Sequence, residues 1–193
     1  MGKGDDPNCS AAAPMPHPAD TGAGGLSFRA PTAEDERAVR CWVSDPACEE
    51  WLGGLEWAQY ALEQEQPFIV CGPDGRAVAM VTGDIYDEWS VMLSLVVDPA
   101  ARGRGIGAAA LQQVIEQRLF GDRELRAEIS WRNRASVATF MKARFVEDEP
   151  DYETRHSIWS RCMDDEERAR ERFEVWKGRG GPLEADYDPG EDW

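Results

Sequence analysis

The sequence predicts a single α/β domain built around a mixed β-sheet. Its 193 residues are 42% hydrophobic and 30% charged, a balance that suits one soluble globular domain. Segments with strand-like and helix-like periods alternate along the chain, as they do in α/β folds. The mostly apolar run Ser90–Val97 is followed by a helical pattern over Gly107–Phe120 and by a further strand-like run, Leu125–Ser130. This order predicts a βαβ unit at the centre of the sheet.

Two helices are expected before this unit, after a short strand over Leu26–Arg29. Thr32 suits the N-cap of the first helix, and Asp35, three residues later, suits the matching position of a capping box. This helix is expected to end near Val43. The second helix is expected over Glu56–Glu65, where apolar residues recur at helical spacing.

Two hairpins are expected on either side of the central unit. The first has strands Phe68–Cys71 and Ala77–Ile85 around a Gly-Pro-Asp-Gly turn, and Pro67 separates it from the preceding helix. The last elements are a short helix and a closing hairpin: Ala135–Ala143, then Phe145–Glu147 with Thr154–Arg161.

Composition divides the chain into three parts. Residues 1–25 are mostly Gly, Ala, Pro and Asp, so ordering them would cost more entropy than burial could return, and we expect a flexible leader. Residues 26–162 hold the α/β pattern and are numerous enough for one hydrophobic core. Residues 163–193 begin with helical spacing and end in Gly, Pro and acids, so we expect an acidic helix and a tail.

The chain is strongly acidic, with 37 acidic against 21 basic residues and a formal net charge of −16. Such a chain repels phosphate backbones, so nucleic acid is a poor partner and a cationic small molecule is a better one. The five cysteines are scattered and include no C-x-x-C pair. We therefore expect reduced thiols, with neither a disulfide framework nor a metal site.

We expect neither a membrane span, nor a signal peptide, nor a myristoyl anchor. There is no apolar run of about eighteen residues, and prolines interrupt the N-terminal stretch that could otherwise form a signal-peptide core. A myristoylation site would need Ser or Thr at the sixth position, where Asp6 stands. We expect a cytoplasmic protein that does not associate with membranes.

The turn after the central strand is rich in glycine and arginine. Gly103, Gly105 and Gly107 let the backbone approach a ligand closely, and the next helix points its free N–H groups at the same place. Arg102 and Arg104 add positive charge to an otherwise acidic chain. The pattern predicts a site for an anion such as a pyrophosphate. A glycine-rich surface turn with two solvated arginines is the alternative interpretation.

Two motifs in this region occur at a familiar separation. The first is a V-x-P strand end followed by R/Q-x-x-G-x-G/A, here Val97-Asp98-Pro99 and Arg102 to Gly107. The second combines N-x-x-A/S, an aromatic residue and K-x-x-F, here Asn133, Ser136, Phe140, Lys142 and Phe145. Together they resemble the acetyl-coenzyme A signature of the GNAT superfamily of N-acetyltransferases. The resemblance covers about residues 26–162.

This resemblance implies both a fold and a cosubstrate. The fold would be a mostly antiparallel sheet flanked by helices, with one parallel strand pair that splays apart to admit the thioester. The cosubstrate would be acetyl-CoA, with its pyrophosphate on the glycine loop and its pantetheine arm along the central strand. The residues expected to bind it are Leu95, Val96, Val97, Arg102, Gly103, Arg104, Gly105, Ile106, Gly107, Ala108, Asn133, Ser136 and Phe140.

The resemblance leaves the catalytic residues unassigned. Many relatives carry a tyrosine as general acid where this chain has Phe140, which has no proton to give. Tyr152 and His156 are candidate substitutes, although each is equally well interpreted as an ordinary strand residue. A general base is also missing from the central strand, where only Ser94 is polar near the expected thioester. A water chain to a carboxylate is one hypothesis, with these candidates: Glu49, Glu50 and Glu128.

Charge is unevenly distributed in a way that bears on the acceptor. Residues 26–98 hold 14 acids and 4 bases, whereas residues 99–162 hold 9 acids and 11 bases. A cationic amine fits the acidic half, although solvated acids on amphipathic helices would give the same asymmetry. The stretch Cys48–Gly54 is a candidate acceptor lip, with Trp51 as an apolar floor and Glu49 and Glu50 as ammonium partners.

Two functions from different classes remain open. The first is transfer of an acetyl group from acetyl-CoA to a primary amine of a cationic small molecule, a protein N-terminus or a lysine. The second is a catalytically silent module that binds acyl-CoA or mediates interactions. Phe140 in place of tyrosine, and the lack of a general base on the central strand, would be consistent with such a module. Compact relatives often pair through their late strands, so a homodimer is a family-level expectation.

Overall fold

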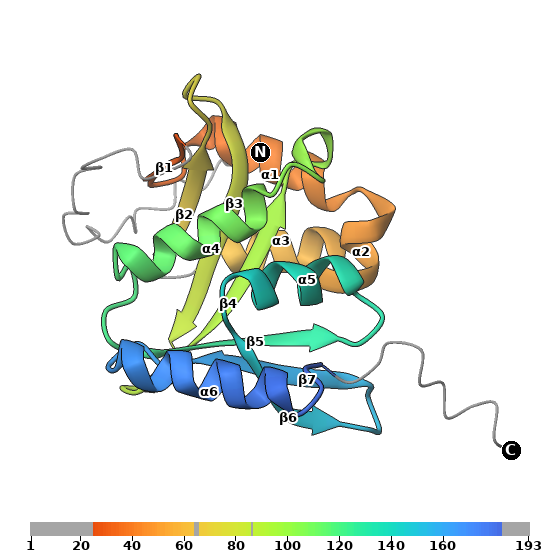
Figure 1. The fold of residues 1–193 in the computed structure, drawn as a ribbon. Helices are drawn as coiled ribbons and strands as arrows, with labels where there is room; N and C mark the ends of the chain where they lie inside the picture. Colours follow the sequence, from red (N-terminus) through yellow and green to blue (C-terminus); the bar gives the residue numbers. More distant parts are fainter. Residues whose placement is uncertain (1–24, 64–65, 86, 183–193) are drawn as a thin grey trace, which may run out of the picture.

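The computed structural model describes residues 25–63, 66–85 and 87–182 (Figure 1). The predicted leader, apart from Gly25, and the last residues of the predicted tail lie outside this part. A seven-stranded sheet runs through the molecule in the order β1-β2-β3-β4-β5-β7-β6. Its strands are β1 (Ser27–Arg29), β2 (Gln66–Cys71), β3 (Ala77–Ile85), β4 (Ser90–Val97), β5 (Glu124–Ser130), β6 (Val146–Asp151) and β7 (His156–Arg161). Only β4 and β5 pair in parallel within the described residues, so the predicted mixed, mostly antiparallel sheet is confirmed.

Helices cover both faces of this sheet (Figure 1). On one face lie α1 (Ala33–Val43), α2 (Pro46–Leu52) and α3 (Gly54–Leu62). On the other lie α4 (Ile106–Glu116), α5 (Arg134–Lys142) and α6 (Glu166–Gly178), and a short 3₁₀ turn, η1 (Pro99–Ala101), links β4 to the α4 loop. No helix in the described ranges is both long and apolar enough to cross a membrane.

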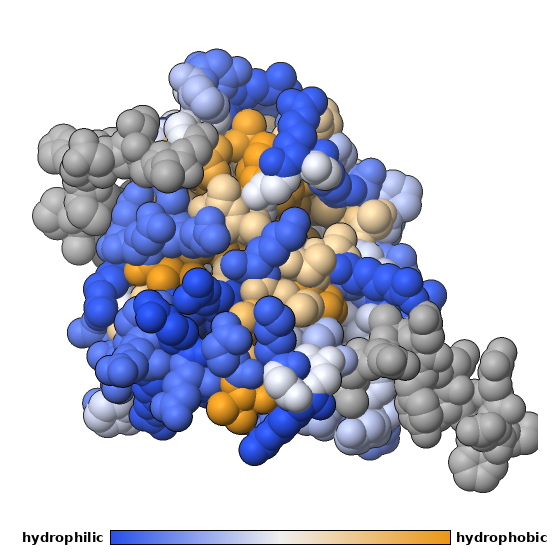
Figure 2. All heavy atoms as spheres, in the orientation of Figure 1, coloured by the Kyte–Doolittle hydropathy of each residue, from blue (hydrophilic) through white to orange (hydrophobic). Residues whose placement is uncertain are grey.

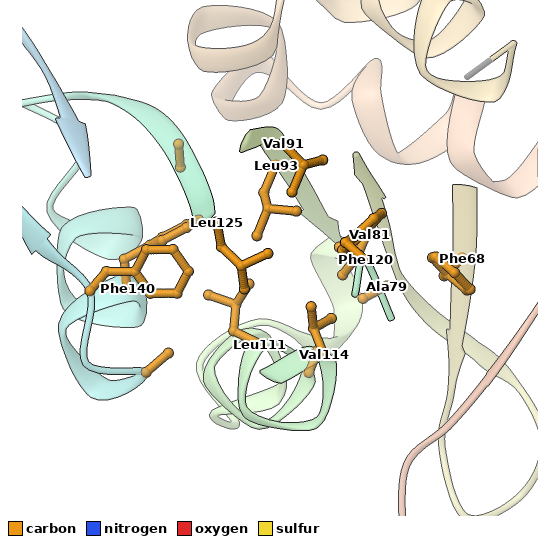
Figure 3. Close-up of a cluster of buried hydrophobic side chains, with 14 of the residues drawn as sticks. Phe68, Ala79, Val81, Val91, Leu93, Leu111, Val114, Phe120, Leu125 and Phe140 are labelled. Atoms are coloured by element: carbon orange, nitrogen blue, oxygen red, sulfur yellow. The ribbon is translucent and has the colours of Figure 1, made fainter. Parts of the chain in front are cut away.

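Two hydrophobic layers hold the helices to the sheet, because successive strand residues point to opposite faces. Phe68, Val81 and Leu93 belong to the layer beneath α4, while Ile69 and Met80 belong to the layer beneath α1, α2 and α3. Figure 3 shows the first layer, in which side chains from α4 and from the strands point toward each other. Helix α6 also joins this layer, where the ring centroids of Trp159 and Trp176 lie 5.6 Å apart.

The parallel pair separates along its length. Pairing between β4 and β5 covers only Ser90–Met92 against Glu124–Arg126, although β4 continues to Val97 and β5 to Ser130. Beyond this point β4 stays paired with β3 as far as Val97. Among the described residues, no strand covers this edge of the far half of β4, which is the splay that the family resemblance implies.

A helix occupies much of the stretch that the sequence predicts only as a lip between two helices. Asp45 caps α2 by accepting the Ala47 N–H at 3.1 Å, and Pro46 stands at the first helical position. Gly53, at φ 81°, ends α2 and begins α3 without a connecting loop. The helix is seven residues long, too short to show a clear hydrophobic period.

Two helix ends also differ from prediction. Helix α3 ends at Leu62, and Pro67 lies inside β2, opposite Thr82 of β3 and beyond the residues of β2 that pair with β1. Proline is tolerated at such an edge position of a sheet. Helix α4 ends at Glu116, before the predicted Phe120. Phe120 is nevertheless buried, and its ring lies edge-on against Phe68 with a 5.5 Å centroid distance. It packs into the core from the turn after α4, so its apolar side chain does not mean that the helix continues to this residue.

Candidate active site

A cleft of about 910 Å³ opens where β4 and β5 separate. It is lined by α2, the far half of β4, the loop before α4, β5, α5 and the turn before β7. Figure 2 shows apolar residues gathering over the N-terminal part of α4 and over α5, whereas the surface over the C-terminal part of α4 and over α6 is mostly hydrophilic. The sheet splay therefore produces a hollow large enough for an extended ligand.

The glycine loop forms one end of this cleft. Gly103 and Gly105 have left-handed backbones, with φ 74° and 77°, and a Cβ placed on either would meet no heavy atom within 4 Å. Gly105 is the N-cap of α4 and makes no side-chain cap hydrogen bond, so the first N–H groups of the helix face the open space. A helix N-terminus with exposed amides attracts anions.

Gly107 serves a different purpose in this loop. A Cβ there would lie 3.1 Å from Cγ2 of Thr139 and 3.3 Å from Cδ2 of Leu95. The absence of a side chain lets α4 approach both α5 and β4 closely. This contact brings the loop, the open β4 edge and α5 together around one cleft.

Helix α5 and β4 supply the middle of the cleft. Leu95, Val96 and Val97 line it along the uncovered strand edge, where an extended ligand arm can hydrogen-bond to the backbone as a further strand would. Asn133 caps α5 by accepting the Ser136 N–H at 3.1 Å, and both residues line the cleft. The cleft also reaches Phe140, which is buried against Phe145 with a 4.9 Å centroid distance.

The side chain of Arg102 is used in a way the sequence does not predict. Its guanidinium donates to Oδ1 of Asp45 at 2.8 Å and to Sγ of Cys48 at 2.9 Å. The hydrogen bond from Arg102 holds the pKa of Asp45 below its usual range. Burial raises the pKa of the Cys48 thiol, and this effect of burial outweighs the lowering effect of the nearby arginine. Arg102 thus links the loop before α4 to the N-terminus of α2.

The other end of the cleft is formed by side chains from distant segments. Glu50 and Trp51 line it from α2, and Glu128 lines it from β5. Glu50 lies 3.9 Å from a guanidinium nitrogen of Arg132, which follows β5. His156, at the start of β7, completes this end. Arg132 and Arg155 line the same part of the cleft, so it presents carboxylates and guanidinium groups together.

Some of the predicted residues lie outside the cleft. Arg104 and Glu49 are exposed and do not line it, although both belong to segments that do. Tyr152 is 61% exposed and packs edge-on against Trp131, with a centroid distance of 5.3 Å. All the other residues predicted to bind acetyl-CoA, and also Glu50 and Trp51, line the cleft.

Residues 35–145 match the model of the acetyltransferase (GNAT) family. The chain belongs to this family. This acetyltransferase accordingly uses acetyl-CoA as its cosubstrate, and the open glycine loop, the α4 N-terminus and the free β4 edge fit the anionic and extended parts of that molecule. A search of curated proteins found no match.

Several solved structures share the fold of the acetyltransferase. A GNAT-family acetyltransferase from Bacillus anthracis superposes with a TM-score of 0.62 at 14% identity, covering 74% of this chain and 98% of its own. The aminoglycoside acetyltransferase AAC(6′)-Ib, solved with coenzyme A and kanamycin, gives 0.58 at 18% identity over 76% and 98% of the two chains. Spermidine N-acetyltransferase from Vibrio cholerae, solved with CoA and spermine, gives 0.58 at 13% identity over 70% and 93%. At these identities the likeness shows the fold alone.

Proposed function

We propose that this acetyltransferase moves an acetyl group from acetyl-CoA to a primary amine of a cationic small molecule. The supporting observation is that one cleft has two chemically different ends. The loop end presents backbone N–H groups to an anion, and the end formed by α2 and β5 offers a cation the carboxylates of Glu50 and Glu128, beside Arg132 and Arg155. A cleft with this polarity suits an anionic cosubstrate and an amine acceptor that meet in its middle.

The cosubstrate would be held mainly by backbone groups. In this proposal the N–H groups from Gly103 to Ala108 bind the diphosphate, and the free edge of β4 over Leu95–Val97 binds the pantetheine arm. Asn133 and Ser136 flank that arm. Acetyl-CoA supplies an activated acetyl group as a thioester, and the chain orients it toward the α2 end.

The acceptor would be held mainly by side chains. Trp51 offers an apolar wall, and Glu50 and Glu128 attract ammonium groups. The net acidity of residues 26–98 draws cations toward the same end of the cleft. Kanamycin and spermine each carry several amino groups, and their presence in structures with this fold also favours a cationic small molecule over a protein.

Protonation of the leaving group does not require a tyrosine at position 140. Phe140 is buried among core residues, and its ring carries no acidic proton. A thiol is a much stronger acid than an alcohol, so the coenzyme can leave as the thiolate and take a proton from solvent or from the attacking nitrogen. Most of the rate enhancement would then come from positioning.

A thiol-release assay tests this proposal. We expect the protein to release coenzyme A from acetyl-CoA in the presence of spermidine or kanamycin, faster than with a neutral amine of similar size. Mass spectrometry should find the product 42 Da heavier than the amine, about the mass of one added acetyl group less a proton. Calorimetric binding of acetyl-CoA without turnover of any amine would favour the silent binding module instead.

A further inference from the structure

His156 lies at the amine end of the cleft with its ring orientation fixed. Its Nδ1 is 2.8 Å from the carbonyl oxygen of Thr154. Because a carbonyl oxygen can only accept a hydrogen bond, Nδ1 must carry the hydrogen. In the neutral ring Nε2 then holds the lone pair, and no hydrogen bond joins it to another residue within the described ranges.

The turn that presents this carbonyl is itself held by a carboxylate. Oδ1 of Asp151 accepts the N–H groups of Glu153 at 2.9 Å and Thr154 at 3.2 Å. Chiefly because of the bond from Thr154, the pKa of Asp151 lies below its usual range. Asp151 is therefore charged at neutral pH, and it fixes the backbone that orients His156.

Strand register places His156 on the same face of the sheet as Glu128. Ser130 of β5 pairs with His156 of β7, and Glu128 pairs with Ile158. Directly paired residues point to the same face, so Glu128 and His156 are diagonal neighbours on that face. Long side chains at diagonal positions of neighbouring strands can reach each other. The opposite face is filled by the core, which takes up Ile129.

The charged groups around this imidazole come from each neighbouring element. Glu128 lies diagonally from it on β5, Asp151 pairs with it on β6, and Arg155 precedes it in the turn before β7. Glu50 of α2 also lines the cleft, and it pairs with Arg132, which follows β5. The ring therefore has both carboxylates and guanidinium groups among its neighbours.

We propose that His156 is the general base of the reaction and accepts the ammonium proton of the acceptor on Nε2. This inference rests on the proposed function. It assigns to one side chain the base that the apolar central strand lacks, and it gives Glu128 the supporting task of stabilising the imidazolium that forms.

The proton and electron balance is complete without another reactant. One ammonium proton passes to Nε2, and the freed nitrogen lone pair forms the new C–N bond at the thioester carbonyl. The C–S bond then breaks, and its electron pair leaves with sulfur. The second proton on nitrogen ends on the thiolate, and the imidazolium returns its proton to water. The net products are an acetylamide, free coenzyme A and one proton.

The pH dependence of kcat/KM for spermidine tests the inference. In the wild type we expect an acid limb that reflects an imidazole, and in His156→Gln a loss of that limb with a roughly 100-fold lower rate at neutral pH. The deficit should shrink as pH approaches the pKa of the amine, because a deprotonated acceptor needs no base. Binding of acetyl-CoA, followed by calorimetry, should be unchanged. Tyr152→Phe, on the same hairpin but outside the cleft, should retain the wild-type profile.

Nitrogen NMR of the free protein provides a readout that is independent of activity. The chain has two histidines, His17 and His156, so comparison with His156→Gln assigns the signals. We expect His156 to carry its hydrogen on Nδ1. Asp151→Ala should reduce the fraction of the ring with hydrogen on Nδ1, and it should lower kcat while leaving KM for acetyl-CoA unchanged.

The outcomes separate this inference from the proposed function. An active wild type whose acid limb persists in His156→Gln, or disappears only in Glu128→Gln, would overturn the role of His156 and leave the function intact. A hydrogen found on Nε2 would also overturn it. A wild-type protein that acetylates no amine would overturn both the proposed function and the role of His156.

Discussion

The two ends of the cleft are built in different ways. The proposed cosubstrate end is formed largely by backbone groups of one continuous stretch, from β4 through the loop to α4. The proposed acceptor end is formed by side chains of three segments that are far apart in the sequence, within residues 47–52, 128–132 and 154–156. A backbone site depends on chain geometry and few residue types, whereas a side-chain site changes with every substitution. The same acetyl donor can therefore be kept while the acceptor varies.

Arg102 is the physical link between these two ends. It belongs to the loop by sequence, yet its guanidinium is bound to Asp45 and Cys48 beside α2. Its side-chain charge is thus already paired, with Arg102 and Asp45 side chains 36% and 30% exposed. We infer that its backbone serves the donor end, while its side chain positions the helix that carries Glu50 and Trp51.

The largest effect is expected from a change at the backbone end. Gly105→Asp puts a carboxylate where the diphosphate would bind, and it should weaken acetyl-CoA binding by about 100-fold or more, equivalent to losing about two charge-assisted hydrogen bonds. Calorimetric titration measures this. Gly75→Asp is a matched control, because Gly75 has φ 76° and open space like Gly105 but lies in the β2–β3 turn.

Both glycine variants should lose about 1 kcal/mol of stability through their left-handed backbones, and only Gly105→Asp should lose binding. Equal binding by the two variants would show that the donor end does not use this loop.

A change outside both ends should alter stability alone. Asp35 accepts two hydrogen bonds from Arg29, at 2.5 and 2.8 Å, and that partner lowers its pKa to about 2. The folded pKa is below the usual 3.8, so this stabilisation is present above pH 4 or so and is lost as pH falls toward about 2. Asp35→Asn should cost about 1 to 2 kcal/mol at neutral pH, after allowance for the part-exposed Arg29.

Urea denaturation at neutral pH and at about pH 3 measures this difference, which should be smaller at the lower pH. Glu36→Gln, at an exposed position on the same helix, should leave the free energy of unfolding nearly unchanged. Affinities for donor and acceptor should match the wild type in both variants, and a shift in either affinity would contradict the separation of scaffold and site.

A smaller effect, confined to the KM for the amine, is expected from a change at the pair of Arg102 and Asp45. Asp45→Asn removes the charge that pairs with Arg102 but keeps a good N-cap for α2. The KM for the amine should rise about fivefold, with little change in the Kd for acetyl-CoA. Arg104→Ala, at the exposed arginine of the same loop, should have the opposite pattern. Identical patterns in steady-state kinetics would show that the two ends are not separable.

The smallest effect is expected at the acceptor carboxylate of α2. Glu50→Gln should raise the KM for spermidine about threefold, and the difference should shrink in high salt because Glu50 is half exposed. Glu49→Gln neutralises the adjacent, exposed residue that does not line the cleft. An equal effect of the two substitutions would mean that only the overall acidity of the helix attracts the amine.

Local patterns in the sequence predicted most of the framework. The capping box at Thr32 and Asp35 and the strand Ser90–Val97 appear as expected, because each depends on neighbouring residues. The glycine loop was equally predictable, since it needs particular residues at fixed spacing. Helix α2 was missed because its signals, Asp45 and Pro46, belong to a segment too short for a clear period.

Contacts between distant segments could not be predicted in the same way. The sequence indicated that the last two strands form a hairpin, but not that β7 lies between β5 and β6. That order places His156 beside Ser130, and with it the proposed base beside the cleft. The pairing of Arg102 with Asp45 likewise joins residues 57 positions apart.

The sequence by itself determined the family and the donor, and it predicted the conformation of the loop that we propose binds the donor, because backbone conformation follows from nearby residue types. The tertiary structure decided which side chains share the acceptor end of the cleft. Strand order and the separation of β4 from β5 depend on how the whole core packs, and no local period encodes them.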